Sequence, residues 1–193
     1  MSSPVKLVAF SGSSRKESLN TKLLLQAVAA ARAAGADVTV VELAAYEMPM
    51  YDGDDETENG LPAGAVEFKK LLRDSDGILI ASPEYNSAYS GLLKNAIDWA
   101  SRSGKDEPPG SVFAGKYAGI LSASPGALGG LRGLFALREL LQNLGVAVLP
   151  NMHAVGQAMT AFNDDGTLKD EKTAAGVAGV AGGLVKTLEK LKA

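Results

Sequence analysis

Short apolar runs alternate with segments of helical periodicity along most of the chain, and this alternation limits the possible folds more than any other feature of the sequence. Continuous apolar runs of four to seven residues are typical of buried strands. The predicted strands cover residues 5–10, 38–43, 77–81, 116–122 and 146–149. The predicted helices cover residues 18–35, 63–73, 92–100, 131–144 and 167–192. Strands separated by helices favour a parallel sheet covered on both faces and joined by right-handed crossovers.

The predicted architecture is an α/β fold with five parallel strands. Of the two strand orders that dominate such sheets, 2-1-3-4-5 suits a five-strand chain. No repeat or domain boundary is evident, so residues 1–193 are expected to form one domain. Residues 44–62, which include an acidic stretch, and residues 101–115 are expected to be loops. Residues 151–166 give no readable pattern except a turn at 163–166.

Composition excludes several classes of protein. The chain has no cysteine, which excludes disulfides, thiolate zinc sites, iron–sulfur clusters and a cysteine nucleophile. Its net charge of −3 gives no electrostatic footprint for nucleic acid. No apolar run approaches the ~20 residues needed to cross a bilayer, and no signal-peptide pattern is evident. We therefore expect a soluble, cytoplasmic protein without nucleic-acid or membrane partners.

Three unusual loops follow the first, third and fourth predicted strands, at residues 11–20, 82–91 and 122–132. In open parallel sheets, ligands bind outside the carboxyl ends of the strands, where the strand order reverses. For the order 2-1-3-4-5, these three loops meet at that crevice. Topology and composition therefore indicate the same ligand site.

The first loop, Ser-Gly-Ser-Ser-Arg from Ser11 to Arg15, is rich in hydroxyl groups and leads into a helix. Backbone N–H groups and the dipole at a helix start favour an anion, and Arg15 can add a charge-assisted pair. The glycine patterns of the P-loop and of dinucleotide sites are absent, because Gly12 is the only glycine here. The loop predicts a phosphate site; the alternative is a serine-rich turn in which Ser18 caps the helix.

The second and third loops carry groups suited to a planar heterocycle. Pro83 stiffens the second loop, Tyr85 offers an aromatic face, and Asn86 offers a donor and an acceptor. A surface tyrosine in a tight turn is the alternative for Tyr85. In the third loop, glycines permit close backbone approach to a ligand and Ser124 supplies a hydroxyl, with a flexible helix entry as the alternative.

Three motifs, taken in chain order, resemble those of the NADPH-dependent FMN reductase family. Gly-Ser-Ser-Arg-Lys-Glu-Ser-Leu-Asn at 12–20 is similar to the phosphate loop of that family. Pro-Glu-Tyr-Asn at 83–86, followed by Leu-Lys-Asn-Ala-Ile-Asp-Trp at 93–99, looks like its most specific signature. Ser-Pro-Gly-Ala-Leu-Gly-Gly-Leu-Arg at 124–132 is similar to its third loop. The resemblance covers residues 5 to about 150.

The resemblance implies a flavodoxin-like three-layer fold with FMN across the three loops and NADPH or NADH as co-substrate. It implies that flavin N5 carries the hydride, so no catalytic side chain and no metal site are assigned. A flavin, quinone, azo dye or metal oxyanion would then accept the electrons, and the protein would be a homodimer or homotetramer. The phosphate is expected near Ser13, Arg15, Ser18 and Asn20, and the ring near residues 83–86. The full set expected to bind the cofactor is Ser11, Ser13, Ser14, Arg15, Ser18, Asn20, Pro83, Glu84, Tyr85, Asn86, Ser124 and Gly126.

Two positions depart from the family pattern. Ala88 stands where the family usually has Ser or Thr, and Ser90 stands where it usually has Pro. Ser90 is expected to cap the following helix, with a looser loop over the flavin as the consequence. The 2′-phosphate of NADPH has three candidate partners: Arg15, Arg102 and Arg132.

Two alternative functions stay open. A flavodoxin-type electron carrier would bind FMN without oxidising NAD(P)H, but such carriers usually present a strongly acidic face around the flavin. A sugar-phosphate or nucleotide-binding module would use the same anion site and leave residues 83–86 unexplained. The single histidine, His153, lies outside all three loops and is expected to be structural.

Overall fold

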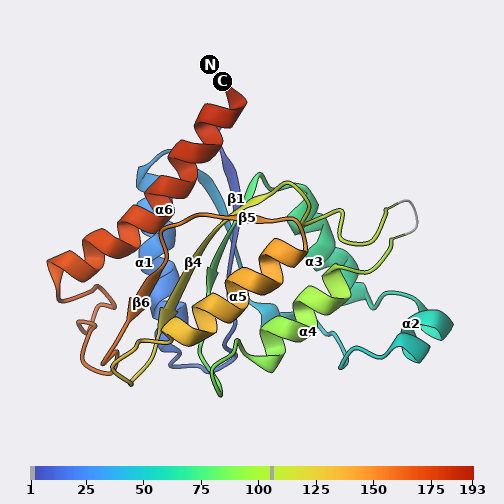
Figure 1. Cartoon of the computed structure of the whole chain (residues 1–193), viewed down its shortest axis with the longest axis horizontal. Helices are drawn as coiled ribbons and strands as arrows, with labels where there is room; N and C mark the ends of the chain where they lie inside the picture. Colours follow the sequence, from blue (N-terminus) through green and yellow to red (C-terminus); the bar gives the residue numbers. More distant parts are fainter. Residues whose placement is uncertain (1–2, 105–106) are drawn as a thin grey trace.

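The computed structural model describes residues 3–104 and 107–193, and its centre is a parallel sheet with the order β2-β1-β3-β4-β5 (Figure 1). The predicted α/β fold and strand order are confirmed. Leu7 of β1 lies beside Val38 of β2 on one side and beside Gly77 of β3 on the other. The strands are β1 (Lys6–Ser11), β2 (Asp37–Val41), β3 (Gly77–Ala81), β4 (Tyr117–Ala123), β5 (Ala147–Val148) and β6 (His153–Val155).

The predicted strand at 146–149 is shortened to β5, and a further strand, β6, forms within the segment 151–166 that gave no readable pattern; both pair with β4. Ala118 of β4 lies beside Val148, whereas Leu121 lies beside His153. Pro150 falls between the two parts, and because proline has no N–H it cannot donate to the sheet there. The chain therefore leaves β4 at Pro150 and rejoins it at His153, a return that no sequence pattern predicts.

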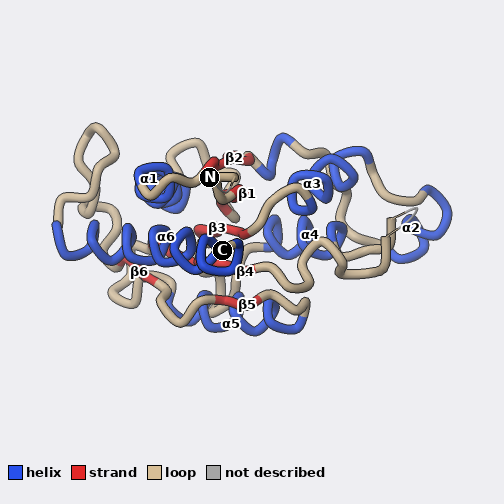
Figure 2. The backbone as a smooth tube through the Cα atoms, turned by 90° about the horizontal axis from the view of Figure 1, so that it is seen from above, coloured by secondary structure: helices blue, strands red, loops and turns tan. Residues whose placement is uncertain are grey.

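Helices cover both faces of the sheet (Figures 1 and 2). One face carries α1 (Leu19–Ala33) and α6 (Glu171–Lys192), and the other carries α3 (Ala63–Arg73), α4 (Gly91–Ala100) and α5 (Leu131–Asn143). Residues of β1 contribute alternately to the two cores, because successive side chains of a strand point to opposite faces of the sheet. Leu7 and Ala9 pack in the core under α1 and α6, while Val8 and Phe10 pack in the core under α3, α4 and α5.

The acidic stretch forms a helix, so the predicted loop at 44–62 is wrong there. A 3₁₀ turn, η1 (Leu43–Ala45), precedes a short helix, α2 (Gly53–Asn59). Asp52 caps α2 by accepting from the Asp54 amide at 2.8 Å, and acidic residues fill the first turn, where the helix dipole favours them. Gly60, with φ 74°, ends the helix. No residue of α2 is buried, so no apolar periodicity could indicate it.

The segment between Glu47 and Gly64, here called the excursion, carries α2 away from the sheet, and its two ends lie side by side. A Cβ placed on Gly64, at the start of α3, would lie only 2.6 Å from the carbonyl oxygen of Glu47. The backbone before the excursion therefore packs directly against the backbone after it. Figure 1 shows α2 at the far edge of the molecule, beyond α3 and α4.

In its described residues the connection at 101–115 is a loop, as predicted, whereas the last helix starts later than predicted. The connection at 101–115, of which residues 105 and 106 lie outside the described part, buries Val112 and Phe113 in the core with α3, α4 and α5. The last helix begins at Glu171 rather than at residue 167, because Asp170 caps it by accepting from the Thr173 amide at 2.7 Å. In the described part of the chain, no helix is both long and apolar enough to cross a bilayer.

Candidate functional site

A cleft of about 280 Å³ opens at the carboxyl ends of β1, β3 and β4, the lower edge of the sheet in Figure 1. The three loops predicted to meet there all contribute to its lining. Of the predicted site residues, the cleft brings together Ser13, Arg15, Ser18, Asn20, Pro83, Glu84, Tyr85 and Ser124. The remaining four, Ser11, Ser14, Asn86 and Gly126, do not line it.

The first loop presents polar groups at the start of α1. Ser18 caps this helix as predicted, because its hydroxyl oxygen accepts from the Thr21 amide at 3.1 Å. The amides of Ser13 and Arg15 donate to the hydroxyls of Ser11 and Ser13, each over 3.3 Å, which is longer than an ordinary N–H···O bond. A phosphate would offer these amides a stronger, charge-assisted acceptor.

Asn20 joins the start of α1 to the end of β4. Its Nδ2 donates to the carbonyl of Ala123 and its Oδ1 accepts from the amide of Ala123, both at 2.9 Å. The residue is buried, and this pairing engages both polar atoms of its side chain. Asn20 therefore holds the first loop against the third, a different contact from the predicted one with the phosphate.

Ser90 joins the first loop to α4. Its hydroxyl donates to the carbonyl of Gly12, and its oxygen accepts from the Leu93 amide at 3.2 Å, so Ser90 caps α4 as predicted. Packing here is close, since a Cβ on Gly12 would lie 3.1 Å from Ser90 Oγ and 3.2 Å from Leu93 Cβ. Serine in place of proline thus adds a hydrogen bond between the second loop and the first, where a looser loop was expected.

Glu84 joins the second loop to α5. Its carboxylate accepts from the Gly133 amide at 3.0 Å and from Arg132 Nε at 2.9 Å, both in the first turn of α5. Burial alone would raise the pKa of Glu84, but the hydrogen bonds and the charge of Arg132 outweigh it and leave the pKa below its ordinary value. The carboxylate thus serves as the anion at this helix N-terminus, where Gly130, the residue before α5, offers no side-chain cap.

A tight turn presents Tyr85 at the edge of the cleft. Tyr85 and Ala88 exchange two backbone hydrogen bonds, and the residues between them, Asn86 and Ser87, have φ values of 51° and 67°. Positive φ at both central positions is typical of a type I′ turn, and asparagine tolerates it well. Tyr85 lines the cleft while 52% exposed, so it is both a turn residue and an available aromatic face.

The segment after β6 completes the cleft, and no sequence pattern indicated it. Gly129, with φ 63°, packs so closely that a Cβ on it would lie 2.6 Å from the Gly156 amide nitrogen. The Ala158 amide donates to the Ser124 carbonyl at 3.1 Å. These contacts bring Met159, 73% exposed, into the lining.

The lining suits FMN at both ends. Ser13, the Arg15 guanidinium and the loop amides are donors of the kind that bind a phosphate. Tyr85, Pro125 and Met159 give apolar surface for a flat ring system, as ligand pockets usually do.

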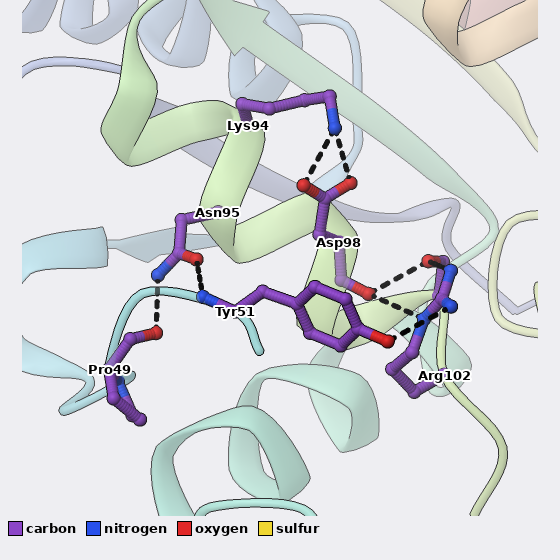
Figure 3. A network of polar contacts seen from close by, with 7 residues as sticks. Pro49, Tyr51, Lys94, Asn95, Asp98 and Arg102 are labelled. Carbon is purple, nitrogen blue, oxygen red and sulfur yellow. Dashed lines mark hydrogen bonds and ion pairs between the residues drawn. The ribbon is translucent and has the colours of Figure 1, made fainter. Parts of the chain in front are cut away.

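The motif on α4 fixes the segment that leads to α2 (Figure 3). The Asn95 Nδ2 donates to the Pro49 carbonyl at 2.8 Å, and its Oδ1 accepts from the Tyr51 amide at 2.8 Å. Trp99 is fully buried and donates its indole N–H to the same Pro49 carbonyl at 2.7 Å. The Arg102 guanidinium lies 5.1 Å from the centre of the Tyr51 ring. This part of the predicted signature therefore serves the architecture, and Trp99 belongs to the core.

Comparisons with known sequences point to one family. Residues 5–160 match the profile of the NADPH-dependent FMN reductase family. The chain is 36% identical over 173 residues to an NAD(P)H-dependent FMN reductase of Pseudomonas aeruginosa, and the match covers 89% of each chain. It is 35% identical over 156 residues to a quinone reductase of Escherichia coli, a match that covers 81% of this chain and 79% of that one.

Solved structures agree with the sequence matches. A flavoenzyme from Paracoccus denitrificans, an NAD(P)H:acceptor oxidoreductase, superposes with a TM-score of 0.81 at 30% identity, covering 96% of this chain and 98% of that one. An oxidoreductase from Corynebacterium diphtheriae, at 21% identity and a TM-score of 0.75, shares the fold and covers 98% of this chain and 99% of that one. The chain is an oxidoreductase with a flavodoxin-like fold, and it belongs to the NADPH-dependent FMN reductase family.

Proposed function

We propose that the protein passes electrons from NADPH or NADH to FMN held in the cleft, and from there to a small acceptor: a flavin, quinone, azo dye or metal oxyanion. Family membership supports FMN and a nicotinamide nucleotide as the redox pair. One observation carries the proposal for this chain, namely that the loops after β1, β3 and β4 line one cleft at the topological switch point.

The roles proposed for the side chains divide between the two ends of the cleft. Ser13 and Arg15 bind the phosphate, with Ser18 holding the helix start behind them. Pro83, Tyr85 and Ser124 line the ring. When bound, FMN supplies the two-electron chemistry between the nicotinamide and the acceptor. The chain binds the cofactor, orients it and limits the access of water.

Three of the predicted ligands act indirectly in this proposal, by shaping the loops. Asn20 and Glu84 act by holding the three loops together, through their contacts with Ala123 and with the first turn of α5. Asn86 supplies the positive φ of the tight turn that presents Tyr85.

The charge around the cleft favours an enzyme over a flavodoxin-type carrier. Glu17 pairs with Lys22 at 3.1 Å and Glu84 pairs with Arg132, so the acidic groups of the lining are neutralised. Arg15 adds a positive charge. The acidic residues of α2 lie at the far edge of the molecule (Figure 1), so among the described residues they add no acidic rim to the cleft of the kind that suits docking of a protein partner.

A homodimer or homotetramer, built from one domain of residues 1–193 and working in the cytoplasm, is part of the proposal. Leu128 in the third loop and Phe135 on α5 are 54% and 56% exposed, and Tyr85 and Met159 at the cleft are exposed as well. Exposed apolar side chains that form one patch mark interaction surfaces, and these four side chains are proposed to form such a patch. A second copy of the chain would remove them from water.

Titration with FMN, followed by NADPH oxidation in the presence of FMN and a quinone, tests the function. We expect FMN to bind and NADPH to be oxidised only by the loaded protein. Arg15→Gln should weaken FMN binding about tenfold, the effect of one lost charge-assisted contact, whereas Lys186→Gln on the exposed face of α6 should not. Protein that takes up no FMN and leaves NADPH unoxidised would contradict the proposal; FMN binding without oxidation of either nucleotide would identify the carrier.

A further inference from the structure

A second recess, of about 270 Å³, lies on the β2 side of the first loop. Ser13 and Arg15 line both this recess and the cleft, so the two hollows adjoin across the loop. Ser11 and Ser14, which were predicted to bind the cofactor but do not line the cleft, line the recess. The proposed FMN site leaves the recess unused.

The chemistry of the recess suits a nucleoside phosphate. Arg15 and Lys16 from the loop and Glu42 directly after β2 line it, together with the apolar side chains of Leu24 and Val40. Six ion pairs occur in the described part of the chain, and none of them involves these three charged residues. Lys16, Glu42 and the apolar wall are therefore available for a second ligand, while Arg15 is shared with the proposed FMN site.

The order of strands and helices places Glu42 directly after β2, beside the first loop, and this position indicates a role in nucleotide binding. In doubly wound sheets that bind dinucleotides, the loop after the first strand lies at the phosphates, and an acidic residue farther along the chain accepts a hydrogen bond from the ribose 2′-hydroxyl. Here β1, the first loop, α1 and β2 occur in the same succession, and Glu42 ends it beside that loop.

Elimination among the arginines points to the same place. Arg132 is paired with Glu84, and Arg102 lies against the Tyr51 ring and donates to the Asp98 carbonyl (Figure 3). Of the three arginines predicted as partners of the 2′-phosphate of NADPH, only Arg15 lines the recess, and Arg15 is already assigned to the FMN phosphate. The structure adds Lys16 beside it in the recess.

We propose that the recess binds the adenosine ribose of the nicotinamide co-substrate and distinguishes NADPH from NADH at the 2′ position. Glu42 accepts from the 2′-hydroxyl of NADH and repels the 2′-phosphate of NADPH. Lys16 attracts that phosphate, so the two side chains act in opposite directions on one choice. This inference rests on the proposed function, since it names the residues that select its co-substrate.

Steady-state kinetics with both nucleotides provide the first test. With FMN-loaded protein, Glu42→Gln should raise the ratio of kcat/KM for NADPH over NADH about tenfold, and Lys16→Gln should lower it by about the same factor. Glu189→Gln and Lys190→Gln, matched changes at exposed positions near the end of α6, should leave the ratio unchanged. General damage to the enzyme would not change the ratio of kcat/KM for NADPH over NADH in opposite directions in the two variants. The proposal requires that Glu42→Gln raises this ratio and that Lys16→Gln lowers it.

Equilibrium binding of adenosine 2′,5′-bisphosphate and adenosine 5′-monophosphate to the FMN-loaded protein gives a readout that needs no turnover. Lys16→Gln should weaken binding of the bisphosphate more than binding of the monophosphate. Glu42→Gln should tighten binding of the bisphosphate. If the enzyme turns over but both variants leave ratio and binding unchanged, the recess proposal is overturned while the proposed function stands. If neither nucleotide is oxidised, the proposed function fails, and the binding comparison still decides what the recess recognises.

Discussion

The hydroxyl of Ser90 donates to the carbonyl of Gly12, and this bond joins the start of α4 to the first loop. The same oxygen accepts from the Leu93 amide, so one buried side chain caps a helix and restrains the loop proposed to hold the phosphate. Proline at this position would fit the φ of −71° but has no hydroxyl to donate.

Ser90→Ala and Ser90→Pro should therefore both weaken FMN binding several-fold. The alanine variant should also lose about 0.5–2 kcal/mol of unfolding free energy, the usual cost of a lost N-cap. Flavin fluorescence titration and urea unfolding measure the two effects. Ser103→Ala, at an exposed serine, is the control. An FMN affinity that both Ser90 variants retain would show that the bond to Gly12 does not restrain the loop.

Tyr85→Ala should change turnover and the KM of the acceptor while leaving the fold intact. Tyr85 is 52% exposed, so its removal should alter the unfolding free energy by no more than ~0.5 kcal/mol. Tyr85→Phe keeps the aromatic face and should retain the wild-type kinetics. Kinetics with a quinone, run beside thermal unfolding of all three proteins, separate the two effects. Unchanged kinetics in the alanine variant would make Tyr85 a turn residue only.

Acid should loosen the contact between Glu84 and the start of α5. The pKa of Glu84 is lower in the folded protein than the ordinary value of 4.5, so the folded state binds this proton less readily than the unfolded state. The stabilisation is complete above pH 4.5 and is lost as the pH falls through the lower, folded pKa. Glu84→Gln should be less stable than wild type near neutral pH, and the difference should shrink in acid. Urea unfolding across this pH range would show it; a difference independent of pH would assign the effect to packing.

Two glycines of α6 should respond in opposite ways to alanine. A Cβ on Gly176 would lie 2.3 Å from His153 Cε1, whereas nothing lies within 4 Å of one on Gly179. Alanine is favoured over glycine inside a helix by about 0.8–1 kcal/mol. Gly179→Ala should therefore stabilise the protein by about that amount, while Gly176→Ala should destabilise it by displacing the imidazole. Thermal unfolding of both variants decides, and equal stabilisation by both would mean that His153 moves aside freely.

Sequence patterns predict the elements whose signal is burial. The strand at 77–81 and the helix at 63–73 lie where apolar runs placed them, because both faces of β3 and one face of α3 are buried. The helix α2 has no buried residue and depends on its Asp52 cap and on acidic residues in its first turn. Composition cannot distinguish such a helix from a solvated loop.

The candidate site was predictable at the level of its loops, and less so at the level of its atoms. Topology alone brings the loops after β1, β3 and β4 together. Topology does not show that both polar side-chain atoms of Asn20 form hydrogen bonds with the backbone of Ala123, or that Glu84 forms an ion pair with Arg132. Those choices depend on long-range contacts, in the same way that Met159 reaches the cleft only because the chain rejoins β4 at β6.

The close approach of Glu47 and Gly64 makes the excursion between them a natural site for engineering. Asn95 and Trp99 hold Pro49 from the α4 side, so the base of the excursion has anchors outside α2, beside the hydrogen bond that Tyr51 donates to Glu56 of α2. Exposed tips with few buried contacts tolerate insertion and domain grafting well. A foreign peptide, an affinity tag or a reporter domain could be inserted at residues 53–59. The chain would leave the fold near Glu47 and return to it beside that point at Gly64, far from the proposed flavin site.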